Sequence, residues 1–171
     1  MKPLILTFLL AGFAHAASLL DVAQQERGVM QDTARQYEYM RVLDSRDFLT
    51  ASATAGWCGA FAKWTLLKAG YQVPRSLDVH DWLAYGQPVA QPRPGDLVIF
   101  RNHVAFFLAR AGFTGQILIL GGAQSRSAGE RSSVCQLWVD EGGALGYRRP
   151  VPAQPRSQRL VAGAPRSQGS I

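Results

Sequence analysis

The chain has 171 residues, of which 47% are hydrophobic, 18% charged and 10% aromatic, and its formal net charge is +6. This length and composition predict one ordinary globular domain, and they exclude a charge-dominated disordered protein and a coiled coil. The two Cys and three His residues are too few ligands for a zinc-ribbon or zinc-finger protein.

Residues 1–16 have the pattern of a secretory signal peptide. Lys2 supplies a positive charge, residues 3–13 are apolar, and Ala14-His15-Ala16 has the small-x-small form of a cleavage site. The apolar run is too short to span a bilayer as a helix. We therefore expect cleavage near Ala16 and a mature protein that is periplasmic or secreted.

Residues 17–150 form the predicted domain, and its first half is expected to be helical. Apolar side chains recur at three- and four-residue steps over residues 29–49, which predicts an amphipathic helix, and residues 50–56 resemble a polar linker. A second helix is expected from Cys58, with Gly70 placed as a C-cap glycine. A shorter third helix is predicted over residues 76–86, with Ser76 as its N-cap.

The second half of the domain is expected to form a sheet. Five short runs rich in branched and aromatic residues, separated by turn residues, predict strands at residues 96–100, 103–110, 116–122, 134–139 and 144–150. Helices followed by consecutive strands favour an α+β domain in which the helices pack on an antiparallel sheet.

Residues 151–171 are rich in Pro, Gln, Ser, Gly and Arg and lack an apolar period, which predicts a flexible tail. The tail contains three Arg and no acidic residue: Arg156, Arg159 and Arg166. It is either a solvated end or a weak contact with an anionic surface of the cell envelope. No nucleic-acid partner is expected after export, and we expect a monomer.

Cys58 and His103 are the candidate catalytic pair. A Cys at a helix N-terminus meets free backbone N–H groups, which we expect to lower its thiol pKa and favour a nucleophile, although a small core residue is the alternative. His103 opens a predicted strand after the Arg101-Asn102 turn, whereas His80 lies between two Asp residues and suits a surface or capping role. Cys on a helix followed by His on a strand is the chain order of papain-like enzymes.

Five segments carry a family resemblance: WCGAFAKWTLLKAG, RPGDLVIF, NHVAFFLA, ILILGGAQS and LGYRRP. Together they resemble the papain-like cell-wall hydrolases of the CHAP and NlpC type, and most closely a phage-lysin-like group with the motifs WCAAFVNW, PGD, GHVGF, GGNQ and GYRRP. The resemblance covers residues 56–150. It implies a papain-like α+β fold and hydrolysis of an amide bond in peptidoglycan, without a metal or an organic cofactor.

The same resemblance implies that Cys58 is the nucleophile and His103 the general base. The Asn of GGNQ falls on Ala123, which cannot orient the imidazole, so Gln124 is the candidate third residue, with a backbone carbonyl or a water as alternatives. The preceding Gly121-Gly122 pair is interpreted as a strand end and turn.

Several other residues have two interpretations. Trp57, Trp82 and Tyr85 line a substrate groove or belong to the core. Asp96 of PGD is expected to shape a loop. Cys135 is expected to be a buried free thiol, because a disulfide with Cys58 would consume the nucleophile.

The resemblance leaves the bond unresolved between N-acetylmuramoyl-L-alanine (an amidase) and a stem-peptide crosslink (an endopeptidase). Two alternatives to a peptidoglycan hydrolase stay open. One is a catalytically weak or inactive relative that binds the cell wall, and the other is an exported interaction protein.

Overall fold

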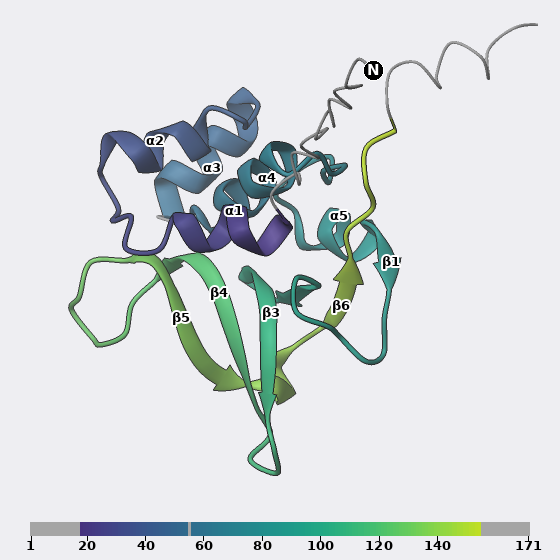
Figure 1. The fold of residues 1–171 in the computed structure, drawn as a ribbon. Helices are drawn as coiled ribbons and strands as arrows, with labels where there is room; N and C mark the ends of the chain where they lie inside the picture. Colours follow the sequence, from purple (N-terminus) through teal and green to yellow (C-terminus); the bar gives the residue numbers. More distant parts are fainter. Residues whose placement is uncertain (1–17, 55, 155–171) are drawn as a thin grey trace, which may run out of the picture.

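The computed structural model describes residues 18–54 and 56–154 and has an α+β fold, as the sequence predicts (Figure 1). Within these residues, six strands form one antiparallel sheet in the order β1-β6-β2-β3-β4-β5. The strands are β1 Gln87–Pro88, β2 Leu97–Phe100, β3 His103–Ala111, β4 Gln116–Gln124, β5 Ser133–Asp140 and β6 Gly146–Arg149. The predicted signal peptide and residues 155–171 of the predicted tail lie outside the described residues.

The five predicted strand runs are confirmed as β2 to β6, with no end shifted by more than two residues. The two-residue strand β1 was not predicted; it pairs with Arg148 and Arg149 at the edge of β6. A 3-10 helix, η1 Glu141–Gly143, occupies the turn between β5 and β6.

The helices differ more from the prediction. The single helix expected over residues 29–49 is two helices, α2 Ala34–Met40 and α3 Ser45–Thr54. Local caps set where each helix begins: Thr33 accepts a hydrogen bond from the Gln36 N–H at the start of α2, and Asp44 accepts one from the Asp47 N–H at the start of α3. Because α3 continues to Thr54, the predicted linker over residues 50–56 is also wrong. An unpredicted helix, α1 Leu19–Gln25, begins at a capping box formed by Ser18 and Asp21.

Helix α4, Cys58–Lys68, is the central helix of the core. Its first nine residues are buried, and it packs against β3 and β4. Gly70 follows the C-cap with φ +77°, a left-handed conformation that glycine adopts without strain, as predicted. Helix α5, Val79–Ala84, is capped by Asp78 rather than by Ser76, whose hydroxyl donates to Asp81 instead.

The sheet has apolar side chains on both faces. Side chains such as Phe106 and Leu120 pack with the helices, whereas Phe107 and Ile119 belong to a smaller cluster with Tyr147. This alternation is the period of two expected of a strand. In Figure 1 the helices form a layer above the long strands β3, β4 and β5.

The folded domain continues beyond the predicted boundary at residue 150. Pro152 forms a bridge with Tyr71, and the Ala153 N–H donates to the Gly70 carbonyl at 2.9 Å. The tail that was predicted to begin at residue 151 is therefore ordered at its start. Across residues 18–54 and 56–154, no helix combines the length and the apolar character needed to cross a membrane.

Candidate active site

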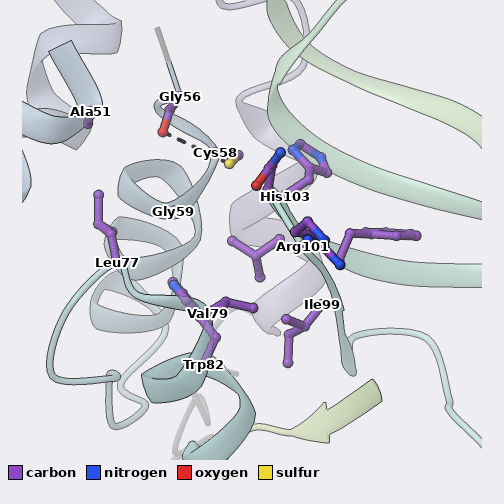
Figure 2. A pocket seen from close by; sticks show the side chains of 13 residues that line it. Ala51, Gly56, Cys58, Gly59, Leu77, Val79, Trp82, Ile99, Arg101 and His103 are labelled. Atoms are coloured by element: carbon purple, nitrogen blue, oxygen red, sulfur yellow. Dashed lines mark hydrogen bonds between the residues drawn. The ribbon is translucent and has the colours of Figure 1, made fainter. Parts of the chain in front are cut away.

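A pocket of about 490 Å³ lies between the N-terminus of α4 and the turn that joins β2 to β3. Cys58 and His103 both line it. Figure 2 shows these two side chains at the same end of the pocket, with apolar side chains from α5, its preceding loop and β2 at the other end. The structure thus brings together the two residues that the sequence pairs.

Cys58 is the first residue of α4 and is only 7% exposed. The backbone N–H groups of Val104, Gly59 and Cys58 lower its pKa, which agrees with the expectation for a helix N-terminus. Burial is the larger effect, however, and the net pKa is raised. The prediction of a lowered thiol pKa is therefore wrong for the pocket as it stands, because the sequence does not reveal how completely the thiol is desolvated.

The next residue, Gly59, lets the pocket wall approach Cys58 closely. A Cβ at this position would lie 2.7 Å from Leu77 Cδ2. Leu77 precedes α5 and lines the same pocket as Cys58. A glycine here therefore allows the apolar wall to pack directly on the first turn of α4.

His103 is the first residue of β3 and pairs with Phe100 across a two-residue turn, as predicted. Burial lowers the pKa of its imidazole to about 4. At neutral pH the pocket therefore holds a neutral imidazole and a neutral thiol, rather than a thiolate-imidazolium pair. Among the described residues, no hydrogen bond links the Cys58 thiol to the His103 imidazole. The two side chains must therefore move closer together when substrate binds, before a proton can pass between them.

Gln124, the last residue of β4, contacts the imidazole as the candidate third residue should. Its Nε2 atom lies 3.0 Å from Nε2 of His103, and Gln124 is 5% exposed. In this orientation the ring Nε2 accepts the hydrogen bond; with the amide rotated by half a turn, Oε1 would accept from a protonated Nε2 and leave Nδ1 free to act as a base. Gln124 can thus hold the ring in either tautomer.

A bulge in β4 places Gln124. The register between β4 and β5 shifts between Gly121 and Gln124, and Ala123 has a φ of +57°. This left-handed conformation is unfavourable for alanine and is tolerated better by asparagine or glycine. The bulge aims the Gln124 side chain at His103, so the residue after Ala123 makes the contact that Ala123 itself cannot make.

Gly121 and Gly122 lie inside β4 and do not form the predicted strand end and turn. A Cβ at Gly121 would lie 3.2 Å from Nε2 of His103, and one at Gly122 would lie 2.5 Å from Cζ3 of Trp57. Because Gly121 lacks a side chain, His103 can lie close to β4, and because Gly122 lacks one, Trp57 can do the same.

Trp57 and Tyr85 belong to the core and do not line this pocket. Trp57 is 1% exposed, stacks on Tyr39 and donates from Nε1 to the Ser132 hydroxyl at 3.2 Å. The hydroxyl of Tyr85 donates to the Gln72 carbonyl at 2.8 Å. Their assignment to a substrate groove is therefore corrected, because packing inside the helical layer removes them from solvent.

Trp82 is the exception among the three aromatic candidates, because it lines the pocket although it is itself buried. The pocket is also lined by four residues that the sequence did not identify as site residues: Leu77, Val79, Arg101 and Asn102. His80 is exposed and lies outside the pocket lining, where its backbone N–H is capped by Asp78. This position agrees with its predicted surface or capping role.

Asp96 shapes a loop, as predicted. Its carboxylate accepts hydrogen bonds from Nε and Nη2 of Arg149 at 3.0 and 2.8 Å and from the Arg93 N–H at 2.8 Å. The PGD and GYRRP motifs thus meet away from Cys58 and His103. Their contact fixes the segment that leads into β2 against β6.

Cys135 is a fully buried free thiol, as predicted, and it forms no disulfide with Cys58. Its sulfur lies 3.8 Å from both the backbone carbonyl and Oε1 of Gln124. Cys135, Gln124 and His103 therefore form a continuous row of contacts behind the pocket.

No cluster of three or more His, Cys, Asp or Glu side chains suited to a metal ion occurs in the part of the chain that the structure describes. Comparison with protein-family models and with curated proteins finds no match to this chain.

Proposed function

We propose that this protein is an exported cysteine hydrolase that cleaves an amide bond of peptidoglycan. The observation that carries the proposal is the meeting of Cys58 and His103 in one pocket, with Gln124 in contact with the imidazole. The resemblance of five motifs to papain-like cell-wall hydrolases supports the substrate class and a papain-like version of the α+β fold. The signal-like N-terminus supports a periplasmic or secreted location, where peptidoglycan is accessible.

The proposed reaction uses the two neutral groups of the pocket. With the Gln124 amide rotated so that Oε1 accepts from a protonated Nε2, Nδ1 of His103 removes the proton from the Cys58 thiol while the sulfur attacks the carbonyl carbon of the scissile amide. The backbone N–H of Cys58, at the start of α4, donates to the oxyanion that develops on the carbonyl oxygen. The protonated His103 then gives its proton to the leaving nitrogen, the carbon–nitrogen bond breaks, and a thioester with Cys58 remains.

Hydrolysis of the thioester completes the cycle. His103, neutral again, removes a proton from a water molecule, which attacks the thioester carbonyl. The carbon–sulfur bond then breaks, and the proton held by His103 returns to the sulfur of Cys58. The raised thiol pKa and the lowered imidazole pKa make the ion pair costly before substrate binds, so thiolate develops during attack rather than in the resting protein.

A catalytically weak protein that binds the cell wall is the second candidate. Ala123 favours it, because this residue replaces the Asn of the GGNQ motif and supplies no hydrogen bond to His103. The contact between Gln124 and His103 favours the hydrolase instead.

Digestion of purified peptidoglycan by the mature protein tests these candidates. We expect soluble fragments from the wild type, none from Cys58→Ala or His103→Ala, and unchanged release from His80→Ala, which removes an exposed histidine. New amino groups with intact muramoyl linkages would identify an endopeptidase, and loss of those linkages an amidase. Cleavage that persists in Cys58→Ala would contradict the hydrolase mechanism, and binding without cleavage by the wild type would favour the second candidate.

A further inference from the structure

The turn between β2 and β3 presents two free polar side chains to the pocket. Arg101 and Asn102 form this turn, both are exposed, and both line the pocket that holds Cys58. Neither side chain has a hydrogen-bond or ion-pair partner among the described residues. The turn itself is fixed, because Phe100 and His103 pair across it. A guanidinium group and an amide are thus held at the pocket rim with their donors unused.

The remaining lining leaves the charge of Arg101 uncompensated. The other pocket residues are apolar or neutral, and no Asp or Glu is among them. His103 is neutral at ordinary pH, because burial lowers its pKa to about 4. The wall beyond Arg101 is formed by Leu77, Val79 and Ile99. A ligand therefore meets one positive charge at the rim and an apolar surface inside.

A guanidinium in this setting suits a carboxylate. Its planar array of N–H donors matches the two oxygens of a carboxylate in a bidentate pair, and an adjacent amide adds one more donor. Arg101 lies on the turn that leads into His103, and both residues line the pocket that holds Cys58, so an anion bound by Arg101 is held in the same pocket as the reacting carbonyl. An extended peptide advances by only about 3.3–3.6 Å per residue, so a carboxylate near the scissile bond along the chain is the one best placed to share this pocket with it.

We propose that Arg101 makes this pocket selective for peptides with a free carboxylate beside the scissile amide, with Asn102 as a secondary donor. The inference rests on the proposed function and refines its substrate class. In a peptidoglycan stem peptide, the carboxylate that Arg101 would bind is the α-carboxyl of glutamate at the second position. A stem peptide in which this carboxyl is amidated should bind poorly. The apolar wall accommodates the small side chain of the adjacent residue.

Binding to the Cys58→Ala protein tests the selectivity without turnover. The ligands are two muropeptides that differ only in carrying D-glutamate or D-isoglutamine at the second position, measured by titration calorimetry. We expect about tenfold tighter binding of the carboxylate form, the size of one charge-assisted contact at a solvent-exposed rim. Adding Arg101→Gln should reduce the preference to less than about twofold, and high salt should weaken it.

The matched control is Arg27→Gln, which makes the same charge change at an exposed arginine outside the pocket lining. Equal affinity for the two muropeptides, or an equal loss of preference in the Arg27 variant, would overturn the inference. Turnover by the protein with native Cys58 separates this failure from that of the proposed function. If both muropeptides are cleaved at a ratio that Arg101→Gln does not change, the selectivity is wrong and the hydrolase stands. If neither is cleaved while the carboxylate form binds more tightly, the hydrolase is wrong and the anion site stands.

Discussion

Replacing Gly122 by alanine would place a methyl group where the core has no room for one. The added Cβ would lie 2.5 Å from Cζ3 of Trp57 and 2.8 Å from Cβ of Phe61. Carbon atoms in contact prefer about 3.5–4.0 Å, so the neighbours must move by about 1 Å. Trp57 cannot yield cheaply, because it is buried, stacked on Tyr39 and hydrogen-bonded to Ser132.

The expected loss is therefore at the upper end of the range for overpacked cores, about 3 kcal/mol of the free energy of unfolding. This corresponds to a melting temperature lower by roughly 6–12 °C in a domain of this size. Urea titration followed by tryptophan fluorescence measures the change. Gly143→Ala is the control, because its Cβ would lie 3.7 Å from the Phe100 ring, an ordinary contact.

Gly121→Ala should affect the site more than the core. Its Cβ would lie 3.0 Å from Nε2 of Gln124, 3.1 Å from Cβ of Ala105 and 3.2 Å from Nε2 of His103. The Gln124 and His103 side-chain ends can shift by a few tenths of an ångström, whereas Cβ of the buried Ala105 can move only with the backbone of β3. We expect a stability loss of about 1 kcal/mol but a fall in kcat/KM of about tenfold, because the imidazole is displaced. The reasoning is refuted if the Gly122 and Gly143 variants unfold at the same urea concentration, or if the Gly121 variant keeps full activity.

Four further outcomes are expected. The pKa of His103 is about 4 in the folded state against about 6.5 when unfolded, so between these values the unfolded chain binds more protons. Its contribution to the free energy of unfolding, up to about 3 kcal/mol, is then present above pH 6.5 and lost as the pH falls toward 4. The Asn side chain does not titrate, so the difference in free energy of unfolding between wild type and His103→Asn, measured in urea, should shrink over that window. A difference that stays constant with pH would contradict the argument. Because burial raises the pKa of Cys58, iodoacetamide should modify it slowly at pH 7 and faster as the pH is raised, whereas fast labelling at pH 7 would show a thiolate. The buried Lys63–Asp47 ion pair, 3.6 Å between Nζ and Oδ2, should cost about 3 kcal/mol when Lys63→Met strands the carboxylate. Adding Asp47→Leu should recover most of that loss in the same urea assay, and a double variant no more stable than the single one would disprove the pairing. Ala123→Gly should raise the free energy of unfolding by about 0.5 kcal/mol, because glycine relieves the positive φ; a destabilised variant would contradict the strain.

The sheet was the most predictable part of the fold. Strands β2 to β6 coincide with short runs of branched and aromatic residues, a signal that is local to each strand. The helices were less predictable, because periodicity continues through residues 41–44 while the capping side chains of Thr33 and Asp44 divide the segment into α2 and α3. The two-residue β1 is held by its pairing with β6, which a sequence pattern does not contain. The seven-residue α1 has a local signal, the Ser18–Asp21 capping box, but is short enough to be missed.

The candidate site also has features that the sequence predicts and features that it cannot predict. Cys58 and His103 stand out because their residue types carry chemistry and their order along the chain is distinctive. The direction of the thiol pKa shift could not be predicted, because it depends on how completely distant segments cover the sulfur. For Trp57 the sequence left a groove and a core interpretation open, because the neighbour that buries it, Tyr39, comes from helix α2. Arg101 gave no signal, because an arginine in a turn is ordinary until the pocket around it is known.

The position of β6 has a consequence for the order in which the protein forms. This strand lies between β1 and β2, and the Arg149 side chain binds Asp96 just before β2. Until residues 146–149 arrive, β2 is an open edge, and the loop that leads into it lacks its ion-pair partner. Strand β2 leads into the turn that delivers His103 to Cys58. Pairing across this distance along the chain is slow compared with local helix formation, so the reactive pocket is expected to be among the last parts of the molecule to be assembled.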